Sequence, residues 1–64
     1  MTIGEKMKSL RKEKGFSQEK LAELADLSIT TIKQCENDVR KLRESTLDAI
    51  AAALGVGVDE LREG

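Results

Sequence analysis

Apolar residues recur at the three- and four-residue spacing of α-helices along most of this 64-residue chain. Near the N-terminus, Ile3, Met7 and Leu10 keep this spacing, and Gly15 follows where a helix would end. Five helices are predicted in this way, beginning near Ile3, Gln18, Ile29, Ser45 and Val58. The pattern indicates an all-α fold, a compact five-helix domain around one aliphatic core.

Two serines mark the middle of the chain. Ser17 and Ser28 each stand where a side-chain oxygen can accept a hydrogen bond from the first turn of a helix. The predicted helices are 18–25 and 29–36, joined by a three-residue corner with apolar residues on its inner side: Leu21, Ala22, Ala25, Leu27 and Ile32. Two short helices joined in this way form a helix-turn-helix over about 17–37. Its second helix exposes one face and fits the major groove of DNA.

A basic linker, 39–44, follows this motif, and the C-terminal helices are expected in about 45–63. Ser45 with Asp48 three residues later predicts the start of the fourth helix, as a variant of the capping box. This helix turns four apolar side chains inward: Leu47, Ile50, Ala51 and Leu54. We expect residues 1–64 to form one domain.

Composition argues against several classes of function. The chain has no histidine, and its one cysteine, Cys35, is expected to face the core, so neither a disulfide nor a zinc or other metal site is expected. No paired base is present to activate a serine, so we expect neither an enzyme nor a cofactor. No apolar run approaches the roughly 20 residues that cross a bilayer. Because the N-terminus is also unlike a signal peptide, we expect a cytoplasmic protein.

The net charge of −1 conceals an uneven distribution. Residues 1–14 hold five basic and two acidic side chains, and residues 39–44 hold three basic and one acidic, whereas the other segments are acidic. Positive charge therefore flanks the third helix in sequence. An acidic protein can still present one basic face to phosphate groups.

The chain resembles the lambda-type phage repressor and Cro family, also called the XRE-like helix-turn-helix family. The resemblance rests on Ile-Gly-Glu-Lys-Met-Lys-Ser-Leu-Arg-Lys-Glu-Lys-Gly-Phe-Ser-Gln-Glu-Lys-Leu-Ala at 3–22 and on shorter matches at 27–28, 32, 36–37 and 53–61. It implies double-stranded DNA binding, usually as a homodimer on a palindromic operator, and a role in transcription, here as a repressor. We expect the dimer surface in the 56–61 tail and adjoining linker. The alternative function is a protein-interaction or antitoxin-like accessory module with the same fold.

Eleven residues are predicted to contact DNA: Gln18, Ser28, Ile29, Thr30, Thr31, Lys33, Gln34, Asn37, Arg40, Lys41 and Arg43. Three of them, Thr30, Lys33 and Gln34, lie on the exposed side of the third helix. There, threonine can touch a thymine methyl, lysine can reach guanine or phosphate, and glutamine can bond adenine. The alternative is an ordinary polar surface helix. Asn37 and the three cationic linker residues are expected to contact phosphates, with at least one of the cations simply solvated.

Three of these residues carry further expectations. Ile29 is expected to be exposed, where it could read a thymine methyl, anchor a protein partner or have no role. Thr31 beside it is expected to contact a phosphate. The resemblance implies that Gln18 bonds a phosphate and braces the start of the recognition helix, the alternative being an ordinary solvated glutamine.

The resemblance also predicts a structural ion pair and two irregular positions. Arg11 and Glu36 stand where many family members hold an ion pair that links the first helix to the end of the recognition helix. Asp26 and Asp38 replace two glycines that the family usually carries, and aspartate can adopt the left-handed backbone at some cost. The carboxylate of Asp38 is expected to lie where phosphates approach and to lower DNA affinity.

Overall fold

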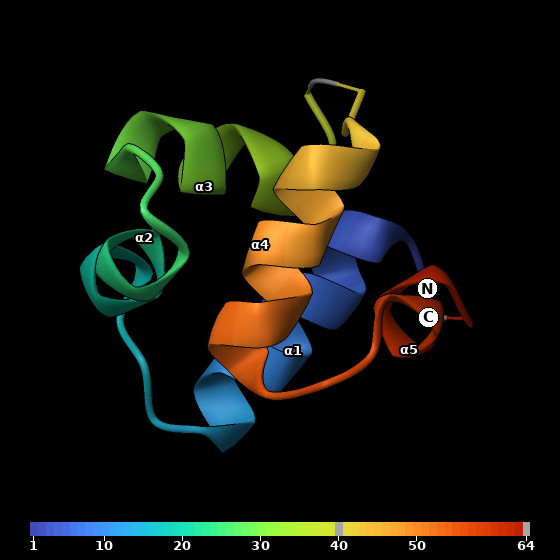
Figure 1. The fold of residues 1–64 in the computed structure, drawn as a ribbon, viewed down its shortest axis with the longest axis horizontal. Coiled ribbons are helices and arrows are strands. Elements are labelled where there is room, and N and C mark those ends of the chain that lie inside the picture. The colour runs from blue at the N-terminus through green and yellow to red at the C-terminus, as the bar shows by residue number, and fades with distance from the viewer. Residues whose placement is uncertain (40, 64) are drawn as a thin grey trace.

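The computed structural model describes residues 1–39 and 41–63, so Arg40, one of the predicted DNA contacts, lies outside the described residues. The helices of the described chain are α1 Ile3–Glu13, α2 Gln18–Ala25, α3 Ile29–Glu36, α4 Glu44–Leu54 and α5 Val58–Glu63 (Figure 1). This architecture confirms the predicted all-α fold with five helices.

In Figure 1, α2 and α5 lie on opposite sides of α4. Contacts join α2 to α3 and α4, and α5 to α1 and α4. A further contact, between α1 and α3, closes the arrangement. As a result α3 lies along one edge of the molecule, where it packs on its neighbours from one side (Figure 1).

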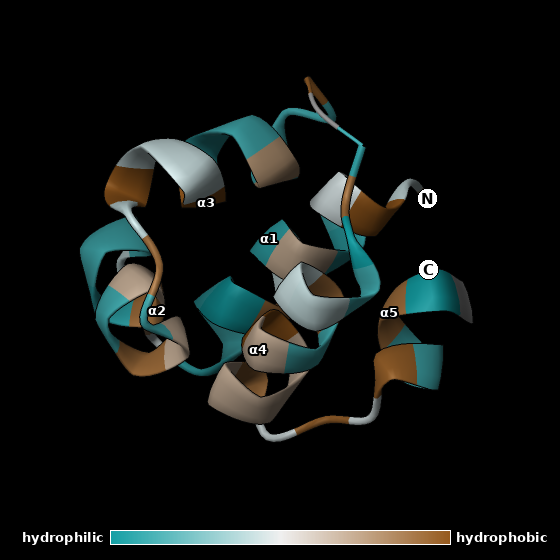
Figure 2. Ribbon diagram, turned by 45° about the horizontal axis from the view of Figure 1, so that its top comes forward, coloured by the Kyte–Doolittle hydropathy of each residue, from teal (hydrophilic) through white to brown (hydrophobic). Residues whose placement is uncertain are grey.

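The core is an aliphatic cluster to which all five helices contribute. Its buried members are Met7, Leu10, Leu21, Ala22, Ile32, Cys35, Leu47, Ile50, Ala51, Leu54 and Leu61. Each helix carries both hydrophobic and hydrophilic residues, as expected for helices that turn one side to a core (Figure 2). The inward positions predicted for the fourth helix and for Cys35 are confirmed.

Local hydrogen bonds and left-handed glycines set the helix ends. The α1 helix begins with a capping box, in which Thr2 Oγ1 accepts from the Glu5 backbone N–H at 3.1 Å and the Thr2 N–H donates to Glu5 Oε1 at 2.9 Å. The α2 helix begins at Ser17, which accepts from the N–H of Lys20 at 3.0 Å. Gly15, with φ of 74°, turns the chain away after α1, as predicted.

The predicted start of α4 is wrong. The helix begins at Glu44, its N-terminal cap is Arg43, and that cap makes no side-chain hydrogen bond. The N–H of Leu47 donates to the carbonyl of Arg43 at 2.9 Å, so the first turn closes ahead of the predicted Ser45 cap. Glu44 favours this earlier start, because a carboxylate in the first turn meets the positive end of the helix and because Glu44 also pairs with Arg62 of α5.

The 56–61 tail, where we expected the dimer surface, gives its apolar side chains to the core. Leu61 is fully buried, and Val56 and Val58 are partly buried against the same cluster. The outer surface of this tail is therefore mainly polar. Among the described residues, no helix combines the length and apolar character needed to cross a membrane.

Candidate nucleic-acid interface

The corner between α2 and α3 is built by local hydrogen bonds. Asp26 ends α2 in the left-handed conformation, with φ of 57° and ψ of 44°. The N–H of Leu27 then donates to the carbonyl of Ala22 at 2.9 Å. Ser28 opens α3 by accepting from the N–H of Thr31 at 3.1 Å. Both helices of the motif have the predicted bounds.

The predicted ion pair joins α1 to the last residue of α3. Arg11 Nε lies 2.7 Å from Glu36 Oε2, and Nη2 lies 3.3 Å from Oε1, so the contact is bidentate. The side chains are 10% and 2% exposed, respectively. Arg11 also donates through Nη1 to the carbonyl of Phe16 at 2.8 Å. The end of α3 is thus tied both to α1 and to the loop before α2.

Gln18 holds the same carboxylate from α2. Its Nε2 donates to Glu36 Oε1 at 3.1 Å. The prediction that Gln18 braces the start of α3 is therefore wrong, because the contact is with the last residue of that helix. A phosphate contact by Gln18 stays a prediction. With Arg11, this bond gives Glu36 partners on both neighbouring helices.

The start of α1 approaches the end of α3 very closely. Asp38, with φ of 57°, accepts hydrogen bonds from Thr2 Oγ1 at 2.6 Å and from the N–H of Gly4 at 3.1 Å. A Cβ added to Gly4 would lie 2.5 Å from the carbonyl oxygen of Cys35 and 2.6 Å from that of Glu36, so this approach requires glycine. The Asp38 carboxylate is directed onto α1 and does not stand as an isolated charge beside α3.

The outer face of α3 carries the side chains predicted to read bases. Thr30 and Lys33 are exposed, and Gln34 is partly exposed. On the inner side of the same helix, Ile32 and Cys35 are buried. The helix therefore presents a polar face outward while its apolar face is held in the core.

The first residue of α3 is less exposed than predicted. Ile29 is half-buried and packs against the core cluster, so the expectation of an exposed side chain is wrong. The cause is the corner itself, which turns the first residue of α3 back toward the core. Thr31 is also half-buried, and its Oγ1 lies 2.9 Å from Oγ of the exposed Ser28.

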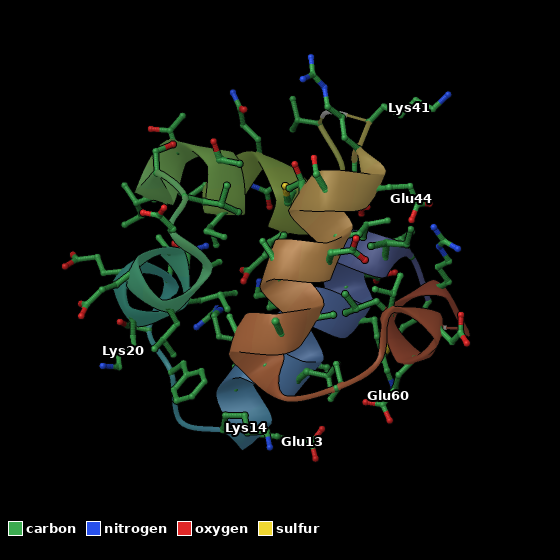
Figure 3. All side chains as sticks on the ribbon, viewed as in Figure 1. Glu13, Lys14, Lys20, Lys41, Glu44 and Glu60 are labelled. Carbon is green, nitrogen blue, oxygen red and sulfur yellow. The ribbon has the colours of Figure 1, made fainter. Side chains whose placement is uncertain are left out.

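The predicted phosphate contacts beyond α3 lie on the surface. Asn37, Lys41 and Arg43 are all exposed. In Figure 3, Lys41 lies at the same end of the molecule as α3, and its side chain points outward from the molecule. In the sequence, these residues lie between the end of α3 and the start of α4.

The basic residues of α1 do not all share this end. Figure 3 places Glu13 and Lys14, which end α1 and follow it, at the opposite end of the molecule from α3. The Lys14 Nζ lies near the left-handed Gly55 at the end of α4. Basic charge that flanks α3 in sequence is thus divided between two ends of the fold.

Sequence reasoning missed the junction of Thr2 and Gly4 with Asp38. The pair of Thr2 and Glu5, three residues apart, is a capping-box pattern that would have marked the start of α1. No local pattern indicates that Thr2 and Asp38 meet, because they are 36 residues apart. The role of Asp38 as a partner of α1 is visible only in the folded chain.

Comparison with known families matches residues 7–61 to the helix-turn-helix family. The chain belongs to this family, and the resemblance to the lambda repressor and Cro type is confirmed. It is 41% identical over 61 residues to the immunity repressor protein of Bacillus phage phi105. That alignment covers 95% of this chain and 42% of the repressor, so the chain spans less than half the length of this relative.

Two solved structures share the fold over nearly the whole chain. SinR, described as the master regulator for biofilm formation and solved in complex with DNA, matches with a TM-score of 0.89 and 33% identity. The match covers 94% of this chain and 97% of SinR. The P22 c2 repressor, solved with a synthetic operator, has a TM-score of 0.92 and 26% identity, covering 100% of this chain and 97% of the repressor.

Proposed function

We propose that this chain binds double-stranded DNA sequence-specifically through α3 and regulates transcription as a repressor. The proposal rests on how the rest of the fold holds α3. Its apolar side is buried, its polar side faces outward, and its last residue is held by a buried ion pair. A helix that reads bases in the major groove must be held in a fixed orientation, because hydrogen bonds to base edges form only when the side chains are correctly placed. The DNA complexes of SinR and the P22 c2 repressor, and the name of the phi105 relative, support the proposal.

The exposed face of α3 would read base edges in the major groove. Gln34 suits adenine, Lys33 suits guanine, and Thr30 can contact a thymine methyl. Ser28, Ile29 and Thr31 would lie at the leading end of the helix. Because Ile29 is half-buried, its part in reading bases would be limited to the portion that stays exposed.

Phosphate contacts would hold the helix in register. The exposed Asn37, Lys41 and Arg43 support this role, and we propose it for Arg40 and Gln18 as well. Such contacts carry no sequence information, but they supply much of the affinity and make it depend on salt.

We propose that the chain acts as a homodimer on a palindromic operator, in the cytoplasm. Two recognition helices would then enter the groove about 34 Å apart, one helical turn of DNA. Since the apolar residues of the 56–61 tail pack into the core, the dimer contact there would be largely polar. We therefore expect a weak dimer that DNA stabilises by mass action.

The alternative, a protein-interaction module, is supported by exposed Leu24, which is 46% exposed on α2. Ile29, the residue that could have anchored such a partner at the start of α3, packs against the core. Val39, just beyond α3, is also exposed, at 70%, but exposed apolar residues that stand singly are common on soluble proteins. DNA binding is therefore the better-supported function.

Selection from random duplexes, followed by titration of the best site at two salt concentrations, tests the proposal. We expect an enriched palindrome and an affinity that falls steeply with salt, because bound phosphates release counterions. No enriched sequence, together with binding no tighter than that of an acidic control protein, would remove this function.

Two substitutions separate base reading from phosphate binding. Gln34→Ala should cost roughly 1–3 kcal/mol on the best site and relax its sequence preference, because a base contact is lost. Lys41→Ala should weaken all duplexes about equally and reduce the salt slope by about one unit. Lys14→Ala, at the opposite end of the molecule in Figure 3, is the matched control and should change neither. Uniform losses for Gln34→Ala across sequences would show that Gln34 does not read a base.

A further inference from the structure

Asp38 is held by the neighbouring helix. Thr2 Oγ1 accepts a hydrogen bond from the N–H of Glu5 at 3.1 Å, so its one proton is directed to Asp38 Oδ2, 2.6 Å away. The other oxygen of the carboxylate accepts from the N–H of Gly4 at 3.1 Å. One carboxylate thus satisfies two donors at the start of α1, and one of them is an amide with no partner inside its own helix.

The negative charge of Asp38 interacts favourably with the N-terminus of α1 and unfavourably with the C-terminus of α3. A carboxylate just beyond the C-terminus of a helix meets the negative end of that helix, whereas at an N-terminus it meets the positive end. Asp38 also has a φ of 57°, a backbone conformation that costs an aspartate more than a glycine. Both costs arise at the end of α3, and the hydrogen bonds to α1 offset them.

The junction lies where the chain leaves α3 for the basic linker. The N–H of Asp38 donates to the carbonyl of Cys35 at 3.2 Å, and that of Val39 donates to the carbonyl of Gln34 at 3.0 Å. The turn that contains Asp38 is therefore continuous with the last turn of α3. Gly4 packs against carbonyl oxygens of that last turn, close enough to exclude a Cβ. A change in the position of Asp38 would therefore move both the end of α3 and the start of the linker.

We propose that Asp38 is a positioning residue for the DNA-binding surface. Its carboxylate clamps the end of α3 and the start of the linker onto the first turn of α1. The inference rests on the proposed function for its consequence, because the clamped segments are those that would read bases and bind phosphates. The clamp itself is a property of the protein without DNA.

The test compares two aspartates that share a left-handed backbone. Asp38→Gly removes the clamp, and Asp26→Gly is the matched control, since Asp26 has the same φ of 57° and is exposed in the corner between α2 and α3. In the protein without DNA, Asp38→Gly should speed hydrogen exchange of the Gly4 amide on the order of tenfold, because that amide loses its acceptor. Asp26→Gly should leave this rate unchanged.

DNA affinity distinguishes a positioning role of Asp38 from a simple charge effect, because the two predict opposite changes in the affinity of the Asp38→Gly variant. Each glycine variant removes one negative charge near α3, which alone would tighten binding to a polyanion. If Asp38 positions the surface, Asp38→Gly should instead bind the selected site about tenfold more weakly. Asp26→Gly should bind equally or more tightly. Asp38→Asn keeps an oxygen acceptor and tolerates the left-handed backbone, so it should recover part of the loss.

Faster Gly4 exchange together with weaker binding supports the proposal. Unchanged Gly4 exchange in Asp38→Gly would show that the clamp does not exist. Faster exchange with equal or tighter binding would show that the clamp does not position the DNA-binding surface. If the unmodified protein bound no duplex, the proposed function and the positioning role would both fall, whereas Gly4 exchange would still report on the clamp.

Discussion

At the C-terminal end of α3, Glu36 is bound by side chains 18 and 25 positions away in the sequence, and the following turn is bound by Thr2, 36 positions away. At the N-terminal end, Ser28 bonds to Thr31, three positions away, and Ile29 is half-buried against the core. The end of the helix is thus fixed by polar contacts from other elements. Its start is fixed by a local cap and apolar packing.

Because of this difference, the two ends of α3 contribute differently to the fold. Long-range bidentate contacts fix direction as well as distance, so the C-terminal end sets the orientation of α3 on the fold. A local cap determines where a helix begins but does not orient it relative to other helices. Substitutions at the C-terminal end should therefore disturb the whole molecule, and those at the start should cost only local stability.

Glu36→Ala is expected to have the largest effect, a loss of about 3–5 kcal/mol in the free energy of unfolding, because it leaves the Arg11 guanidinium buried without its partner. Urea unfolding followed by circular dichroism measures this loss. The matched control is Glu23→Ala, which removes an exposed carboxylate from α2 and should change stability by no more than about 0.5 kcal/mol.

A double-mutant cycle of Arg11→Met and Glu36→Gln isolates the energy of the pair. A coupling energy below about 1 kcal/mol is typical of exposed ion pairs. Such a value would mean that the C-terminal end of α3 is no more strongly held than its start, and the contrast between the two ends would be lost.

Gly4→Ala should come next, with a loss of about 1–3 kcal/mol, because the added Cβ overlaps backbone oxygens that cannot move without separating α1 from α3. Alanine normally stabilises a helix relative to glycine, so the sign itself is informative. Thermal unfolding measures the change. Gly57→Ser is the control, since a Cβ there meets no atom within 4 Å, and its stability should stay within about 0.5 kcal/mol or rise.

Ser28→Ala should have the smallest effect, a loss of about 1 kcal/mol, because the cap on the Thr31 N–H and the exposed hydroxyl contact with Thr31 disappear while Ile29 keeps its packing. Urea unfolding reports the cost, and Ser17→Ala, which removes the equivalent cap of α2, provides the comparison. A loss as large as that of Glu36→Ala would show that the two ends of α3 are held equally strongly.

The sequence by itself predicted the elements whose causes are local. Helical spacing of apolar residues located the helices, and serine caps placed the starts of α2 and α3. The left-handed Asp26 was predicted from the resemblance, because the family usually carries glycine at that position of the corner. The pairing of Arg11 with Glu36 was also predicted, because the resemblance to a known family supplied the long-range relation that periodicity could not.

Only the tertiary structure decided which distant residues meet. The partner of Gln18, the depth of Ile29 and the attachment of Asp38 to α1 all depend on how the helices cross. The early start of α4 likewise involves Glu44, whose partner Arg62 comes from another helix. Periodicity and capping report on a residue and its neighbours within a turn or two, whereas a helix crossing is the joint result of packing the whole core.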